Sequence, residues 1–317
     1  MMAEALGYSS YQIDTGLYRP RHAACYLIED GGEIAIIDTG TQYSLPRVLE
    51  GFERLGATPD RVRYVIPTHV HLDHAGGAGQ LMQACPHATL VVHPKGQPHM
   101  VDPSRLQAGA TAVYGEAAFA RDFGTLLPVD EARTIAAEDG QQFPLGRREL
   151  TFLHTPGHAN HHGCIFDHHS GYLYTGDTFG LGYTELRQHG TPLLVATTTP
   201  VAFDPDAWFD SLERMMALEP RACCLTHFGK ISNPADHVDM LRGSIQAHVD
   251  IALEEEAREA DGREARLRTA VGDLLVTAGT RHSALDDATV RGIFASDIEL
   301  NAQGLNVWLK RRAKKRQ

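Results

Sequence analysis

The sequence predicts an α+β protein in which two β-sheets pack against each other with helices outside, followed by a helical C-terminal part. Strand-like and helical segments come in blocks rather than in the alternation of a doubly wound sheet. Strand-like runs stop near residue 235, and helical spacing of apolar residues continues to about residue 312. The hydrophobic content of 43% is ordinary for a globular chain of 317 residues.

The first block combines short apolar strands with a few helices. Leu45–Leu55 carries apolar residues at helical spacing, and residues 95–125 predict several short helices. The predicted strands of this block are Cys25–Ile28, Ile34–Ile37, Val62–Ile66 and Ala88–His93.

The second block again combines short strands with a helix and adds a long loop. Gly180–Pro200 predicts an irregular loop with one short strand, and Asp206–Leu218 predicts a helix. The predicted strands are Arg133–Ala137, Gln141–Leu145, Glu149–His154, Gly163–Phe166, Gly171–Tyr174 and Ala222–Leu225.

We expect two domains, with residues 1–234 forming the first and residues 235–317 a helical extension. In the extension, Val238, Leu241 and Ile245 share one helix face, and Gly262 interrupts that helix. The extension could serve as a lid over an active site, as a homodimer interface, or as both.

Composition excludes several classes of protein. The net charge of −11 argues against nucleic-acid binding, because phosphate contacts need a basic surface. No apolar run is long enough for a membrane span, and Met1–Ser10 lacks the pattern of a signal peptide. The five cysteines form neither a disulfide framework nor a zinc knuckle, so we expect buried thiols and a cytoplasmic location.

Four metal-type side chains lie within six positions, at His69, His71, Asp73 and His74. Imidazole and carboxylate groups are the ligands that borderline-soft divalent metals bind. The cluster directly follows the predicted strand Val62–Ile66, and the carboxyl end of a strand is where such folds place active sites. The segment therefore predicts a metal site.

Three later strand ends enlarge this site. His158 follows a Pro-Gly turn, Asp177 follows a strand and a glycine, and His227 follows the last predicted strand. Four strand-to-loop junctions thus each present a metal-type ligand, which favours one shared metal centre.

In this order, the motifs resemble those of the metallo-β-lactamase superfamily, with a glyoxalase II-like ligand set and similarity to a poorly characterised branch of its hydrolases. The resemblance implies a four-layer αββα sandwich and two divalent metal ions, with Zn²⁺ as first choice and Fe or Mn as alternatives. It implies that His69, His71 and His158 hold one ion, that Asp73, His74 and His227 hold the other, and that Asp177 bridges them.

The resemblance implies hydrolysis of a small-molecule substrate. A water between two cations would have its pKa lowered towards about 7, so that a metal-bridging hydroxide could attack an ester, thioester or lactone carbonyl. Asp73 could also transfer a proton to the leaving group. Asp38 ends a neighbouring strand and is a candidate to orient a ligand histidine through a hydrogen bond.

Other functions remain open at the level of sequence. Asp177 favours glyoxalase II, lactonases and phosphodiesterases over true β-lactamases, which typically lack this bridging carboxylate. An iron-dependent oxidoreductase of the same fold, handling oxygen or persulfide chemistry, is the alternative from a different class. A regulatory protein whose helical extension binds a partner is the third.

Overall fold

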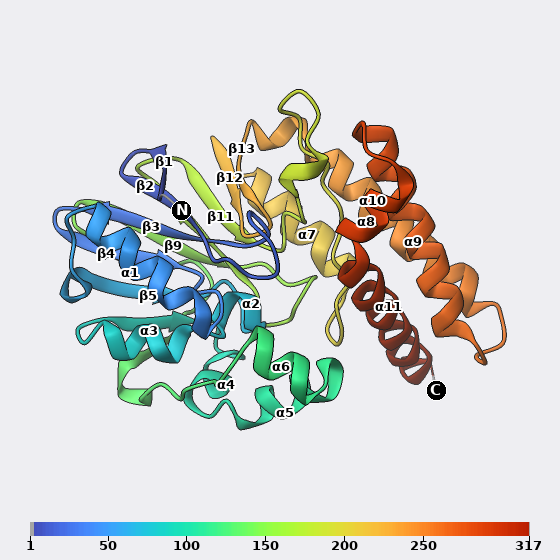
Figure 1. The fold of residues 1–317 in the computed structure, drawn as a ribbon, viewed down its shortest axis with the longest axis horizontal. Coiled ribbons are helices and arrows are strands. Elements are labelled where there is room, and N and C mark those ends of the chain that lie inside the picture. The colour runs from blue at the N-terminus through green and yellow to red at the C-terminus, as the bar shows by residue number, and fades with distance from the viewer. Residues whose placement is uncertain (1–2, 317) are drawn as a thin grey trace. The chain divides into compact units, whose positions relative to one another are not determined.

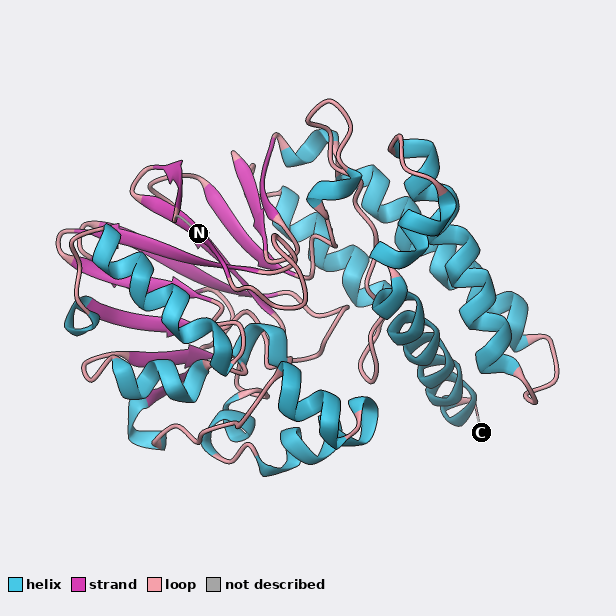
Figure 2. Ribbon diagram, viewed as in Figure 1, coloured by secondary structure: helices cyan, strands magenta, loops and turns pink. Residues whose placement is uncertain are grey.

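The computed structural model describes residues 3–316, which form two compact units. Both sheets lie in the first unit and the C-terminal helices in the second (Figure 2), so the predicted α+β class is confirmed. The predicted boundary between residues 234 and 235 stays a prediction. The first unit comprises the described part of Met1–His154 with His161–Gly176 and Pro220–Ser232, and the second comprises Thr155–Asn160, Asp177–Glu219 and the described part of Asn233–Gln317.

The first sheet has the strand order β1-β2-β3-β4-β5-β6-β7. Its pairs are antiparallel from β1 to β4 and parallel from β4 to β7. Because β4 and β5 are parallel, the residues that follow them lie at the same edge of the sheet. The strands are β1 (Glu4–Gly7), β2 (Ser10–Asp14), β3 (Ala24–Asp30), β4 (Glu33–Ile37), β5 (Val62–Ile66), β6 (Thr89–Val92) and β7 (Thr134–Ala136).

The second sheet has the order β13-β12-β11-β10-β9-β8. Only the pair β11–β12 is parallel among its described strands. The sequence did not predict β1, β2 or β13, because each is a short segment in which polar and apolar residues mix. The strands are β8 (Gln141–Leu145), β9 (Arg148–His154), β10 (Gly163–Asp167), β11 (Tyr172–Gly176), β12 (Ala222–Leu225) and β13 (Gly229–Ser232).

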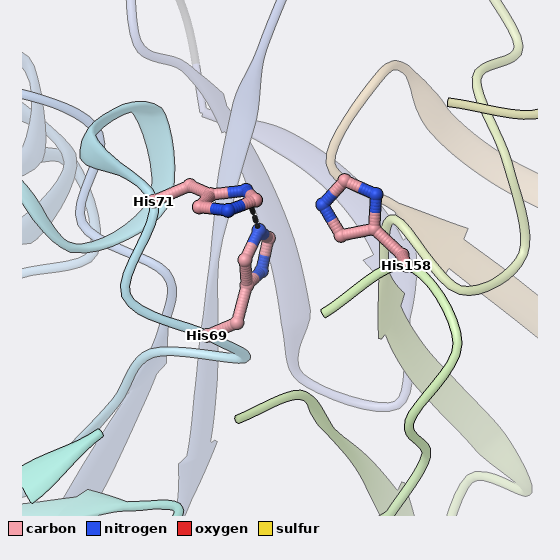
Figure 3. A group of neighbouring side chains, drawn as sticks. All are labelled: His69, His71 and His158. Atoms are coloured by element: carbon pink, nitrogen blue, oxygen red, sulfur yellow. Dashed lines mark hydrogen bonds between the residues drawn. The ribbon is translucent and has the colours of Figure 1, made fainter. Parts of the chain in front are cut away.

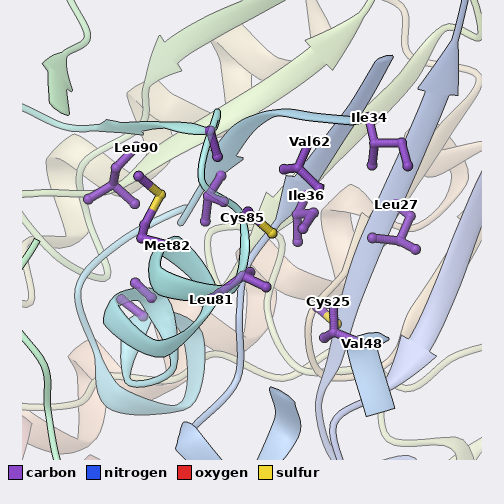
Figure 4. Close-up of a cluster of buried hydrophobic side chains, with 14 of the residues drawn as sticks. Cys25, Leu27, Ile34, Ile36, Val48, Val62, Leu81, Met82, Cys85 and Leu90 are labelled. Atoms are coloured by element: carbon purple, nitrogen blue, oxygen red, sulfur yellow. The ribbon is translucent and has the colours of Figure 1, made fainter. Parts of the chain in front are cut away.

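The first sheet is buried on both faces, and β3 shows how. Successive side chains of a strand point to opposite faces. Tyr26 and Ile28 therefore join a core that also contains side chains of the second sheet, such as Phe152. Cys25 and Leu27 join the core on the other face (Figure 4). All five cysteines are buried, as predicted.

Helices α1 (Leu45–Arg54) and α3 (Ala78–Ala84) cover that second face of the first sheet (Figure 1). Val48 and Phe52 of α1 and Leu81 of α3 belong to this core. Figure 4 labels Val48 and Leu81. The remaining helices of the first unit are α2 (Leu72–Ala75), α4 (Gln97–Val101), α5 (Ser104–Tyr114) and α6 (Glu116–Asp122).

Replacing Phe52 by alanine should destabilise the protein by about 3–5 kcal/mol, because the ring is 1% exposed and its loss leaves a cavity under α1. Denaturant unfolding followed by circular dichroism measures this change. Glu53→Ala is the matched control: Glu53 is the next residue of α1 but is exposed, so its substitution should stay within about 0.5 kcal/mol. Equal effects of the two substitutions would contradict the assignment of Phe52 to the core.

The second unit is mainly helical. Helix α9 packs against α8, α10 and α11, and Gly262 precedes α9 in a left-handed conformation, where the sequence predicts the helix break. Within residues 3–316, no helix combines the length and apolar character needed to cross a membrane. The helices are α7 (Pro205–Met216), α8 (Val238–Glu256), α9 (Arg263–His282), α10 (Asp287–Ile293) and α11 (Ala295–Lys315).

The prediction of a short strand within Gly180–Pro200 is wrong. Among the described residues, this segment forms only the isolated bridges Leu181–Val195 and Gln188–Thr191. The reason is that the backbone after Val195 bonds to helix side chains instead of a neighbouring strand. The N–H of Ala196 donates to Oγ of Ser244, at 2.9 Å.

His248 makes the stability of the protein sensitive to acid. Burial lowers the pKa of this fully buried imidazole from 6.5 to about 4. Between these two pH values the unfolded chain binds a proton that the folded chain does not, so stability falls by about 1.4 kcal/mol per pH unit as the pH decreases.

We therefore expect the wild-type protein to lose about 2 kcal/mol more than His248→Gln between pH 7 and pH 5. Denaturant unfolding at the two pH values measures the difference, and the other histidines cancel because both proteins contain them. Identical pH dependence of the two proteins would contradict the prediction.

Candidate metal centre

Asp38 ties the ends of the two sheets together. It follows β4 and is fully buried. Oδ1 accepts hydrogen bonds from the N–H (2.7 Å) and hydroxyl (2.9 Å) of Thr68, which follows β5. Oδ2 accepts from Nδ1 of His74 (2.8 Å) and from the hydroxyl of Thr226 (2.6 Å), which follows β12 in the second sheet. One carboxylate thus orients a predicted ligand and joins both sheets beside it.

Asp73, His74 and His227 form a group whose ligand atoms all lie within 4.8 Å of one another. Nδ1 of His74 donates to Asp38, and Nδ1 of His227 donates to the carbonyl oxygen of His22 at 2.8 Å. In each ring, Nε2 is therefore the atom that would coordinate a metal. Oδ2 of Asp73 lies 3.0 Å from Nε2 of His227 and 3.5 Å from Nε2 of His74.

This donor set fits a divalent metal. Imidazole nitrogens with the other ring nitrogen bonded to an oxygen acceptor are typical of metal-binding histidines, because that bond selects the tautomer and the ring orientation. The side chain of Asp73 is 27% exposed, whereas those of His74 and His227 are 0% and 4% exposed. The carboxylate is therefore the member of the group that solvent reaches most easily.

His69 and His71 lie beside this group. Nε2 of His69 is 2.8 Å from Nδ1 of His71, and this contact is drawn in Figure 3. The ring centroid of His69 lies 4.0 Å from that of His74. His162 is buried and stacks on His69 with a centroid distance of 4.8 Å, and the ring of His161 is 5.6 Å from that of His71.

The first unit thus brings together five of the predicted ligands, while the second unit carries the other two. Oδ2 of Asp177 lies 3.4 Å from Nε2 of His158, and both residues are buried. Nδ1 of His158 donates to the carbonyl oxygen of Thr197 at 2.8 Å, so that Nε2 is again the nitrogen that would coordinate a metal. The ligands of the first unit are His69, His71, Asp73, His74 and His227.

The Pro156-Gly157 turn that carries His158 is held by α7. Oγ of Ser211 donates to the carbonyl oxygen of Pro156 at 2.6 Å, and the N–H of Asp204 donates to that of Gly157 at 2.8 Å. Gly157 has φ of +141°, and a Cβ there would lie 2.4 Å from Cβ of Trp208. Only glycine fits this position, so the turn is determined by close packing as well as by its sequence.

Asp38 was predicted to orient a ligand histidine, and it accepts a hydrogen bond from His74. The sequence predictions did not include the other groups that hold Asp38 or these histidines. They are the hydroxyls of Thr68 and Thr226 and the carbonyls of His22 and Thr197. A signal exists for the threonines, since Thr-His occurs at the ends of both β5 and β12. The carbonyl acceptors have no sequence signal, because every residue has one. His154 ends β9, and its Nε2 donates to the carbonyl oxygen of Ala137. It is not one of the residues predicted to hold a metal.

A two-sheet α+β fold with histidines and aspartates gathered at strand ends defines a metal-binding class of hydrolase type. The chain belongs to the metallo-β-lactamase superfamily, whose family model matches residues 18–227. The predicted family and its α+β fold with C-terminal helices are therefore confirmed.

The chain is 27% identical to the metallo-β-lactamase fold-containing protein ST1585 of Sulfurisphaera tokodaii over 199 residues, which are 61% of this chain and 72% of the relative. The crystal structure of ST1585 from Sulfolobus tokodaii superposes with a TM-score of 0.65 at 23% identity and covers 94% of this chain and 98% of that chain. This structural similarity shows the fold.

Thioesterases are also among the similar proteins. The chain is 28% identical over 183 residues to the acyl-coenzyme A thioesterase MBLAC2 of Bos taurus, covering 55% of this chain and 64% of the relative. It is 28% identical over 167 residues to an atrochrysone carboxyl ACP thioesterase of Aspergillus chevalieri, covering 52% and 43%. The aligned segments span less than two thirds of both thioesterases.

Proposed function

We propose that this protein is a dinuclear metal-dependent hydrolase that cleaves a thioester, or a related ester or lactone, in a small-molecule substrate. The observation that carries the proposal is the group of Asp73, His74 and His227, in which two oriented imidazoles and a carboxylate place their ligand atoms within 4.8 Å of one another. The thioesterases among the similar proteins favour a thioester over the other acyl substrates.

Two divalent ions, with Zn²⁺ as first choice, would be held as the resemblance implies. Asp73, His74 and His227 would hold one, His69, His71 and His158 the other, and Asp177 would bridge them. Bound there, the ions would supply Lewis acidity and a water of lowered pKa. The net charge of −11 favours a small molecule over nucleic acid as substrate.

The residues of the chain contribute orientation and proton transfer. Asp38 and the carbonyl of His22 hold the rings of His74 and His227, so the tautomer and orientation of both rings are set before a metal binds. Asp73 is the most exposed member of the group, and its carboxylate would carry a proton to the leaving sulfur or oxygen.

The test is metal analysis combined with a substrate panel. Protein reconstituted separately with Zn²⁺, Mn²⁺ and Fe²⁺ is assayed against acyl-coenzyme A thioesters, acyl-N-acetylcysteamine thioesters, lactones and phosphodiesters. We expect about two ions per chain and thioester hydrolysis that a chelator removes and added metal restores.

Other outcomes point to the alternative functions. Cleavage of phosphodiesters alone would assign a phosphodiesterase. Iron as the bound metal, with oxygen or persulfide consumption and no hydrolysis, would assign an oxidoreductase. A protein that binds no metal would overturn the proposed hydrolase as well as the phosphodiesterase and the oxidoreductase.

A further inference from the structure

The loop segment Ala196–Thr198 in the second unit is held by the C-terminal helices. The N–H of Thr198 donates to Oδ1 of Asn301 on α11 at 2.8 Å, and Oγ1 of Thr198 donates to the carbonyl oxygen of Asn301 at 3.1 Å. Nδ2 of Asn301 donates to the carbonyl oxygen of Ala196 at 3.2 Å. One asparagine side chain therefore satisfies backbone groups on both sides of Thr197.

Asn301 is itself held from α8. Its Nδ2 lies 3.3 Å from Nε2 of His248, whose Nδ1 donates to the carbonyl oxygen of Ser244 at 2.8 Å. Because Nδ1 of His248 carries the proton, Nε2 is the acceptor for Asn301. Both side chains are fully buried, and burial lowers the pKa of His248 to about 4, so the ring stays neutral at pH 7. The donor and the acceptor are thereby determined in both hydrogen bonds that link Asn301, His248 and Ser244.

The segment Ala196–Thr198 also packs closely against the backbone of α11. A Cβ at Gly304 of α11 would lie 1.5 Å from the carbonyl oxygen of Thr198, so the loop backbone rests directly on the helix backbone one turn after Asn301. Between the two groups held by Asn301 lies the carbonyl of Thr197, the acceptor for Nδ1 of His158. The helices and the predicted ligand are thus joined by an unbroken series of buried contacts.

We propose that Asn301, supported by His248 and Ser244, is a positioning residue for the metal ligand His158. It holds the Thr197 carbonyl where that carbonyl selects the Nδ1–H tautomer of His158 and directs Nε2 toward a metal. This inference rests on the proposed function, and it gives the C-terminal helices a role besides that of lid or dimer interface.

The experiment compares Asn301→Leu with Asn306→Leu in the full-length protein. Asn306 is also a buried asparagine of α11, but its Nδ2 donates to Glu264 on α9 rather than to the loop. Both substitutions should lower the melting temperature. Two further measurements separate positioning from stability: the ring ¹⁵N shifts of His158 in metal-free protein, assigned with His158→Gln, and the Zn²⁺ affinity in competition with a chelating dye.

We expect Asn301→Leu to move His158 from one Nδ1–H tautomer to a mixture and to weaken binding of one Zn²⁺ by about 10- to 100-fold, while Asn306→Leu changes neither. If Asn301→Leu does not fold, Ser244→Ala, which removes the acceptor of the Ala196 N–H, should shift the His158 signals in the same direction and weaken Zn²⁺ binding about 3-fold.

Two contrary results have different meanings. Unchanged His158 signals and Zn²⁺ affinity in Asn301→Leu, relative to Asn306→Leu, would overturn the positioning role and leave the proposed hydrolase intact. Wild-type protein that binds none of Zn²⁺, Mn²⁺ and Fe²⁺ would overturn the proposed function, and the ¹⁵N shifts of His158 would still decide whether Asn301 orients this ring.

Discussion

Replacing Asp177 by alanine should remove the proposed hydrolysis and one of the two proposed metal ions. As the proposed bridge, Asp177 neutralises charge between the ions, and its loss should weaken one site far more than the other. Metal-assisted catalysis is worth several kcal/mol and each 1.36 kcal/mol changes a rate tenfold, so we expect at least about a 1,000-fold loss of kcat/KM. Elemental analysis should show about one ion per chain in place of two.

The control for this prediction is Asp206→Ala. Asp206 belongs to the same unit and is exposed on the first turn of α7, so its loss should leave both activity and metal content near those of the wild type. Full activity and two ions in Asp177→Ala would refute the bridged two-metal scheme.

Replacing Asp38 by alanine should destabilise the protein by about 3–5 kcal/mol and weaken metal binding by about 10- to 100-fold. The substitution leaves the N–H of Thr68 and the hydroxyls of Thr68 and Thr226 buried without their acceptor, and each such loss costs about 1–3 kcal/mol before relaxation. It also frees the ring of His74 to rotate.

Denaturant unfolding with and without Zn²⁺ measures both effects of Asp38→Ala. Asp60→Ala is the control, because Asp60 is an exposed aspartate of the same unit and should change stability by no more than about 0.5 kcal/mol. A metal-free Asp38→Ala protein as stable as Asp60→Ala would show that the carboxylate does not join the two sheets.

The fold was predictable where the signal was local. The buried strands β3, β4 and β5 are continuous apolar runs, and α1 has a clear helical period, so their positions follow from periodicity. The strands β1, β2 and β13 lack such a pattern. The prediction of a short strand in Gly180–Pro200 was wrong for another reason. In this segment the N–H groups of Ala196 and Thr198 donate to the side chains of Ser244 and Asn301 instead of to a neighbouring strand.

By itself, the sequence determined the family, the α+β class and the residues that carry metal-type side chains, because ligands at strand ends leave a short and ordered motif. The sequence also offered Asp38 as an orienting group, but only the tertiary structure decided which ligand it orients and which other groups take part. Asp38 is 188 residues from Thr226, and Thr198 is 103 residues from Asn301. Hydrogen bonds between residues so far apart leave no spacing pattern, and they exist only once the strand ends and helices have been brought together by burial of the apolar cores.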